Sequence, residues 1–157
     1  MRSLVLIADD VAIVQRIRTA LRYAAALRFD ATLDARTGVR EEIARLAPDV
    51  VVVADSCQRV NTIRRLLEVR GSAPAATVLV LSSPAGGSSE DAFRCGADGI
   101  LAADTEAPAL GMVLGQIGLG HLQLARRSEP DLPAADRELP PLHVVTGQDA
   151  RATRSNA

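Results

Sequence analysis

The 157-residue sequence contains no lysine and no tryptophan, and it is poor in aromatic residues. All 18 lysine-or-arginine positions are arginine, so any mechanism that needs an ammonium side chain within this chain is excluded. The exclusion covers the lysine-dependent phosphate-binding loop GxxxxGK[ST]. Aromatic residues make up only 2% of the chain, so we expect a core built from Val, Leu, Ile and Ala.

Cysteine, net charge and long apolar runs are also scarce. Cys57 and Cys95 show neither metal-ligand spacing nor a disulfide framework, which is typical of reduced thiols in a cytosolic protein. A net charge of −1 gives no whole-protein reason to expect nucleic acid or an anionic membrane as partner. No apolar run approaches the ~20 residues that span a bilayer. We therefore expect a cytoplasmic protein without membrane contact.

Short, continuously apolar segments recur along the chain. They are "SLVLIAD" (3–9), "VVVVAD" (50–55), "TVLVLSS" (77–83), "GILAAD" (99–104) and, more weakly, "RFDATLDA" (28–35). Such runs are typical of strands buried on both faces of a parallel sheet. Between them, apolar residues recur every three or four positions, which predicts helices over 14–24, 39–46, 63–71, 89–95 and 110–117, the last continuing toward Leu124.

Five strands alternating with five helices predict an α/β fold, a five-stranded, doubly wound parallel sheet with helices on both faces. We expect this domain to cover residues 1–125. Residues 126–157 hold four of the eight prolines and show no sustained period, which predicts a linker and flexible tail. Ligands of such sheets bind beyond the carboxyl ends of the strands.

Polar side chains gather at those strand ends. Asp9 and Asp10 follow the first strand, Asp55 the third, and Ser82 closes the fourth. Three convergent carboxylates repel one another, and oxygen-only ligands favour Mg²⁺ as the ion that relieves the repulsion. The Ser82 hydroxyl could then contact a phosphoryl group carried on a carboxylate. Taken singly, the acid pair equally suits a helix cap, and Ser82 a turn.

Four segments carry a resemblance to a known family: "VLIADD" (5–10), "APDVVVVAD" (47–55), "VLVLSS" (78–83) and "CGADGILAAD" (95–104). In order and spacing they resemble the receiver domains of bacterial response regulators, the CheY-like superfamily, and most of all those of LuxR-type regulators. The resemblance spans residues 1 to about 125. It implies the flavodoxin-like (βα)5 fold.

The resemblance also implies a function in two-component phosphorelay signalling, with no enzymatic activity beyond self-phosphorylation and dephosphorylation at an aspartate. In the family, an aspartate ending the third strand accepts a phosphoryl group from a histidine kinase. An acid pair binds Mg²⁺, a lysine neutralises the phosphoryl charge, and a Ser or Thr senses it. Asp9 and Asp10 match the acid pair, Ser82 matches the hydroxyl, and Asp55 is the candidate phosphoacceptor and third Mg²⁺ ligand. The implied partners are a histidine kinase or other signalling protein, and a second copy in a homodimer.

Several positions depart from the family pattern. Ala103 stands at the lysine position and Ile100 at that of the usual aromatic ring, and the loop "SCQRVN" is short. Counting without gaps from the "PD" at 48–49 puts Ala54 on the phosphoacceptor position and Asp55 one residue beyond. Because successive side chains of a strand face opposite ways, this offset turns the carboxylate away unless a bulge restores it.

Three functions follow as hypotheses. The first is a degenerate, atypical receiver that works mainly through protein contacts, with weak or absent phosphorylation. The second is a competent, Mg²⁺-dependent receiver that uses Asp55. The third is a small flavodoxin-like protein that binds a nucleotide or flavin, although the chain's only aromatics are Tyr23, Phe29 and Phe93.

LuxR-type regulators continue into a helix-turn-helix domain. Here about thirty residues with four prolines follow the receiver-like segment, too few for a recognition helix and its support. We therefore expect no complete DNA-binding domain and no direct DNA binding. Both a stand-alone and a truncated regulator fit this length.

Overall fold

The computed structural model describes residues 1–55, 59–84 and 89–121. Cys57 and the tail predicted for 126–157 lie outside the described residues. The elements are β1 (Arg2–Ala8), α1 (Val11–Ala20), a 3-10 helix η1 (Leu21–Tyr23), β2 (Leu27–Asp34), α2 (Arg40–Leu46), β3 (Val50–Ala54), α3 (Arg59–Ser72), β4 (Thr77–Ser82), α4 (Ser89–Arg94), β5 (Gly99–Ala102) and α5 (Ala107–Leu119).

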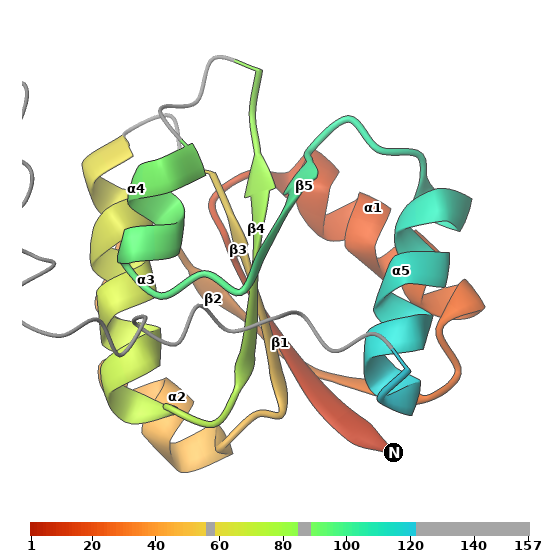
Figure 1. The fold of residues 1–157 in the computed structure, drawn as a ribbon, viewed down its shortest axis with the longest axis horizontal. Coiled ribbons are helices and arrows are strands. Elements are labelled where there is room, and N and C mark those ends of the chain that lie inside the picture. The colour runs from red at the N-terminus through yellow and green to blue at the C-terminus, as the bar shows by residue number, and fades with distance from the viewer. Residues whose placement is uncertain (56–58, 85–88, 122–157) are drawn as a thin grey trace, which may run out of the picture. The chain divides into compact units, whose positions relative to one another are not determined.

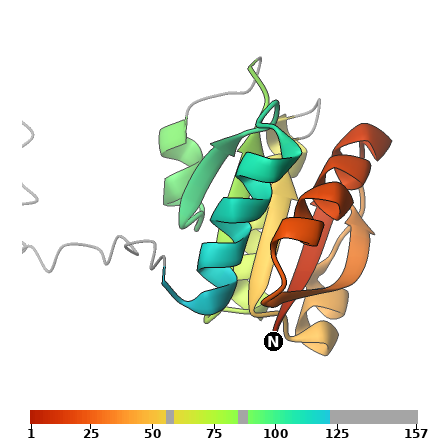
Figure 2. The ribbon, with the colours of Figure 1, turned by 90° about the vertical axis from the view of Figure 1, so that its right-hand side faces the viewer.

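The five strands form one parallel sheet in the order β2-β1-β3-β4-β5. Helices α1 and α5 cover one face, and α2, α3 and α4 cover the other (Figure 1). Figure 2 shows α1 and α5 side by side on their face, and the two helices are in contact. The predicted doubly wound α/β fold is therefore confirmed. Its strand order reverses between β1 and β3, which is where ligands of such sheets bind.

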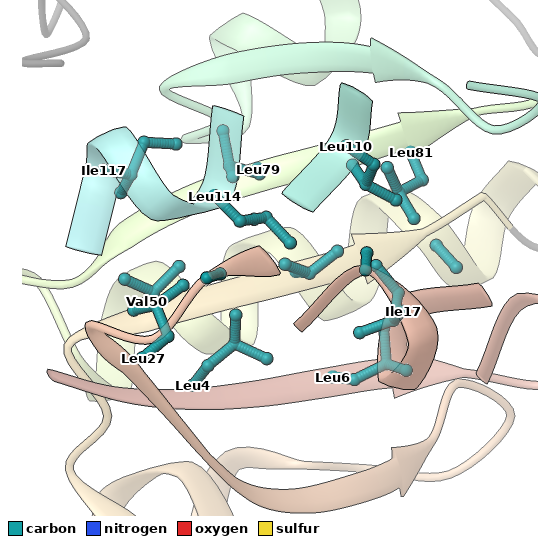
Figure 3. Close-up of a cluster of buried hydrophobic side chains, with 14 of the residues drawn as sticks. Leu4, Leu6, Ile17, Leu27, Val50, Leu79, Leu81, Leu110, Leu114 and Ile117 are labelled. Carbon is teal, nitrogen blue, oxygen red and sulfur yellow. The ribbon is translucent and has the colours of Figure 1, made fainter. Parts of the chain in front are cut away.

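The alternating side chains of β3 build two separate cores. Val50, Val52 and Ala54 belong to a cluster with residues of α1 and α5, part of which is drawn in Figure 3. Val51 and Val53 belong to a second cluster with residues of α2, α3 and α4. All five residues are buried, as the continuous valine run predicts for a central parallel strand. Each fully buried valine side chain contributes about 1.5 kcal/mol.

Helix ends differ from the sequence prediction at several points, among them the start of α3 at Arg59 rather than at 63, and two of the differences have a clear cause. Helix α1 begins at Val11, before the first predicted stripe residue, because the Asp10 carboxylate caps it by accepting from the backbone N–H of Ala12. Helix α5 ends at Leu119, short of the predicted continuation toward Leu124. The reason is Gly120, whose φ of 76° is a left-handed conformation that terminates helices.

Partly buried polar contacts tie together the amino-terminal edge of the sheet. The Asp49 carboxylate accepts from the backbone N–H of Ser3 at 2.8 Å, which joins β3 to β1. Asp98 accepts from the N–H of Val78 at 2.8 Å and from Arg70 Nη2 at 2.9 Å. These contacts explain the aspartates of the "PD" and "GADG" segments as structural residues.

In the described part of the chain, no helix is both long enough and apolar enough to cross a membrane.

Candidate functional site

The carboxyl ends of the parallel strands meet at one edge of the sheet. Strand β1 pairs with β3 up to Ile7 opposite Val53, and Asp9 and Asp55 each follow that last pair by two residues. The backbone N–H of Asp55 donates to the Leu81 carbonyl at 2.8 Å, which places Asp55 beside Ser82. The structure therefore brings Asp9, Asp55 and Ser82 to the same level of the edge.

The Asp55 carboxylate is buried and turned toward α3. The residue is 8% exposed, and its Oδ1 accepts from the Thr62 hydroxyl at 2.8 Å. Ala54 faces the opposite way, into the cluster that includes α1 and α5. The pairing of β3 with both neighbours runs without a register shift, so no bulge exchanges the two positions. The position that an ungapped count from the "PD" at 48–49 gives to the phosphoacceptor, Ala54, thus carries a methyl group.

The acid pair at the end of β1 is divided between two environments. Asp10 is exposed, and its Oδ1 holds the first turn of α1 through the Ala12 N–H at 2.8 Å. Asp9 is half-buried at the strand end. Among the residues that the structure describes, no group of three or more His, Cys, Asp or Glu side chains is arranged to hold a metal ion. The three acids therefore do not form a ready three-carboxylate centre, and Mg²⁺ binding by Asp9, Asp10 and Asp55 stays a prediction.

Ser82 closes β4 opposite Ala102. It is half-buried, and its hydroxyl donates to the Ser83 carbonyl at 3.4 Å. The carbonyl of Ser82 accepts from the N–H of Ala103 at 2.9 Å, which fixes the end of β5 beside it. The hydroxyl thus lies at the sheet edge that the sequence predicts, in a weak local hydrogen bond.

A positive charge reaches this edge from α1. The half-buried Arg16 donates through Nη1 to the backbone carbonyl of Ala103, the position where the resemblance places a lysine. Ile100, at the position of the family's aromatic ring, packs against the cluster that includes α3 and α4. The edge therefore has a guanidinium near the end of β5, although it has no ammonium group.

Asp34, at the end of β2, is a fourth acid at this edge. It lies on the outermost strand and is paired with Arg36. Arg36 donates to it through Nε at 3.0 Å and Nη2 at 2.9 Å. These hydrogen bonds favour the charged carboxylate and lower the pKa of Asp34 below its usual range.

Sequence reasoning did not single out Thr62 or Arg16. Their roles depend on how α3 and α1 are rotated over the sheet, which local residue patterns do not determine. One signal was present: Thr62 is a polar residue within the apolar stripe of a helix, and such residues need a buried partner.

A shallow pocket lies at the other end of the molecule. Residues 47–49 and 72–76 line it, next to the amino-terminal ends of β3 and β4. It is therefore remote from the strand ends that carry Asp9, Asp55 and Ser82.

No protein-family model and no curated protein sequence matches the chain. Solved structures do. The receiver domain of AraT, a response regulator from Geobacillus stearothermophilus, is 22% identical with a TM-score of 0.65, over 77% of this chain and 96% of that one. A LuxR-family DNA-binding response regulator from Staphylococcus aureus is 15% identical with a TM-score of 0.63, over 75% and 99%. The Vibrio cholerae chemotaxis protein CheY4 is 18% identical with a TM-score of 0.60, over 74% and 98%. The chain therefore has the CheY-like fold of response-regulator receiver domains.

Proposed function

We propose that this protein, given its receiver fold, is an atypical receiver module of bacterial two-component signalling that works mainly through protein–protein contacts. Phosphorylation of Asp55 is weak or absent in this proposal. Its partners are a histidine kinase or another signalling protein, and a second copy of the chain, in the cytoplasm.

The observation that carries the proposal is the position of the Asp55 carboxylate. It is buried beside α3 and accepts from Thr62 at 2.8 Å, whereas the resemblance, counted without gaps, puts the phosphoacceptor at Ala54. A phosphoryl group needs space, solvent access for in-line attack and neutralising charge. Burial beside α3 restricts both the space and the solvent access at Asp55. The Ala103 side chain supplies no neutralising charge.

The test is incubation of the full chain with acetyl phosphate and Mg²⁺, followed by its intact mass. We expect the wild type and Asp55→Asn each to keep its own unmodified mass. A stable, stoichiometric gain of one phosphoryl group that disappears in Asp55→Asn would refute the proposal. Ser82→Ala is the matched control for modification elsewhere at the edge.

A second candidate function is favoured by the alignment of Asp9, Asp55 and Ser82 together with Arg16. In this version Asp55 accepts the phosphoryl group in the presence of Mg²⁺. The Arg16 guanidinium neutralises the phosphoryl charge in place of the missing lysine. Arg16→Ala would then lower the phosphorylated fraction strongly. Arg22→Ala, at an exposed arginine of η1, is the control and would leave the phosphorylated fraction unchanged.

A further inference from the structure

The pocket at the amino-terminal edge of the sheet lies between two loops. One loop joins α2 to β3, the other joins α3 to β4, and both lie at the lower end of the sheet in Figure 1. The volume of the pocket is about 210 Å³. Pockets that hold drug-sized ligands have volumes of roughly 300–1,000 Å³. This pocket therefore has room for one small group rather than for a nucleotide or a flavin.

Backbone contacts hold both loops in place. The N–H of Thr77 donates to the Asp49 carbonyl at 2.9 Å, which joins the second loop to the first. Arg70 donates to the carbonyl of Pro74 at 2.9 Å. Pro48 and Pro74 also restrict the backbone, because a proline ring fixes φ. The pocket is therefore formed before a ligand arrives, which lowers the entropic cost of binding.

The walls combine small apolar side chains with two polar ones. Six of the eight lining residues are alanine or proline, and the other two are Asp49 and Ser72. Ser72 is half-buried, and its hydroxyl has no hydrogen-bond partner among the residues that the structure describes. In small-molecule sites a few polar groups within an apolar lining fix the orientation of the ligand. The chemistry of Asp49 and Ser72 therefore decides which ligand the pocket accepts.

The exposed Asp49 carboxylate uses only one of its two oxygens inside the protein. Its Oδ2 accepts from the backbone N–H of Ser3 at 2.8 Å and from the Ser3 hydroxyl at 3.3 Å. Within the described part of the chain, nothing donates to Oδ1 and no cation forms an ion pair with Asp49. A hydrogen bond to Asp30 and, to a smaller extent, the charge of Asp49 raise the pKa of Arg28, but the guanidinium stays bonded to Asp30. Asp49 thus keeps a negative charge and one acceptor oxygen for a ligand.

We propose that this pocket binds a small primary alkylammonium ion. The ammonium group donates to Asp49 Oδ1 and to the Ser72 hydroxyl, and the alkyl chain lies against the alanines and prolines. A charged donor on a carboxylate makes a stronger hydrogen bond than a neutral donor does. The chain contains no lysine, so apart from its own amino terminus the ammonium group comes from another molecule.

The occupied oxygen of Asp49 favours an ammonium group over a guanidinium. A guanidinium fork binds a carboxylate best through two parallel hydrogen bonds, one to each oxygen. Because Ser3 already holds Oδ2, only a contact to a single oxygen remains. An ammonium group is a compact point charge whose three donors can reach separate acceptors. It can therefore serve Asp49 and Ser72 together and leave one donor for water.

A titration of the full chain with n-butylammonium chloride tests the proposal, followed through the backbone amide signals of Asp49 and Ser72 in nuclear magnetic resonance. We expect saturable shifts in the millimolar range, because a small ligand with few contacts binds weakly. The alcohol n-butanol has the same chain without the charge, and tetramethylammonium has the charge without a donor. Both should bind about tenfold more weakly than n-butylammonium or less tightly still.

Two variants assign the binding to the two polar residues. Asp49→Asn removes the charge but keeps a carbonyl that can accept from Ser3, and it should weaken n-butylammonium binding about tenfold. Ser72→Ala leaves the contact between Asp49 and Ser3 intact and should weaken binding about threefold. Asp104→Asn, at an exposed acid beyond β5, is the control and should bind as the wild type does.

Three results would overturn the proposal. They are a wild type without saturable shifts, n-butanol binding as tightly as n-butylammonium, and a folded Asp49→Asn that binds as tightly as the wild type. If Asp49→Asn does not fold, unchanged binding by Ser72→Ala overturns the proposal instead. The pocket is remote from Asp55, so the result of this titration does not depend on the outcome of the phosphorylation assay.

Discussion

Thr62 is fully buried in α3, and its hydroxyl donates to the buried carboxylate of Asp55. Hydrogen bonds to buried charged groups are worth more than neutral ones, because the charge has lost its water. Thr62 thus does two things: it satisfies a polar group inside the fold, and it holds the candidate phosphoacceptor on the α3 side of the sheet.

We predict that Thr62→Val lowers the free energy of unfolding by about 1.5–3 kcal/mol, since it keeps the side-chain shape and removes one donor to a charged group. Urea unfolding followed by circular dichroism measures the change. Thr62→Ser, which retains the hydroxyl, is the control and should lose less. Equal stability of wild type and Thr62→Val would show that the hydroxyl contributes nothing to holding Asp55.

Arg65 is an unusual buried cation. It is 5% exposed and pairs with Glu68 at 3.3 Å, but its Nε and Nη1 have no hydrogen-bond partner in the structure as described. Glu68 also accepts from the backbone N–H of Val39 at 2.7 Å. The carboxylate therefore supports both a buried guanidinium and the loop before α2.

Substitutions at these two positions should destabilise the fold to different extents. Glu68→Ala leaves the buried Arg65 without its carboxylate and should cost about 3 kcal/mol of unfolding free energy. Arg65→Met removes two unpartnered donors and should leave stability within about 1 kcal/mol of the wild type. Denaturant midpoints of both variants and of the double variant provide the measurement. A larger loss in Arg65→Met than in Glu68→Ala would contradict this view.

At the scale of elements, Arg70 near the end of α3 joins three segments. Its guanidinium donates to the carbonyls of Pro74 at 2.9 Å, Ala76 at 3.0 Å and Gly96, and it pairs with Asp98 at 2.9 Å. The planar fork of an arginine matches several acceptors at once, which a lysine cannot do. Arg70 therefore fixes α3, the start of β4 and the approach to β5.

We predict that Arg70→Lys destabilises the fold by about 2–3 kcal/mol, because the ammonium cannot reach all the acceptors that the guanidinium satisfies. Arg45→Lys is the matched control, since Arg45 on α2 pairs with Glu42 at an exposed site and should change stability by less than about 0.5 kcal/mol. Thermal unfolding of the two variants makes the comparison. If Arg70→Lys and Arg45→Lys unfolded at similar temperatures, Arg70 would not be needed to hold α3, β4 and β5 together.

Element type and order were predictable because buried parallel strands and amphipathic helices differ in period and composition. The four valines of β3 illustrate this, since a run that is apolar on both sides needs helices on both faces of the sheet. The ends of helices were less predictable. The end of α5 at Leu119 depends on the left-handed conformation of a single glycine, Gly120.

At the scale of the whole molecule, the parallel topology gathers the strand ends at one edge, so the meeting of Asp9, Asp55 and Ser82 could be expected from the sequence. The direction of each side chain there could be expected only in part. The alternation of side chains along β3 turns Asp55 away from the side that Ala54 faces. The hydroxyl that donates to Asp55, however, belongs to Thr62 of α3, and the sequence does not determine how that helix is rotated over the sheet. The same holds for Arg16, which crosses from α1 to Ala103.

The central claim is that the strand-end acids are engaged in structural contacts rather than assembled for Mg²⁺-dependent phosphoryl transfer. A magnesium titration of the full chain, followed through the backbone amide signals in nuclear magnetic resonance, tests it most directly. We predict that the signals of Asp9, Asp10 and Asp55 stay in place through the millimolar range. Saturable shifts of all three that disappear in Asp55→Asn would contradict the claim and favour a competent phosphoacceptor.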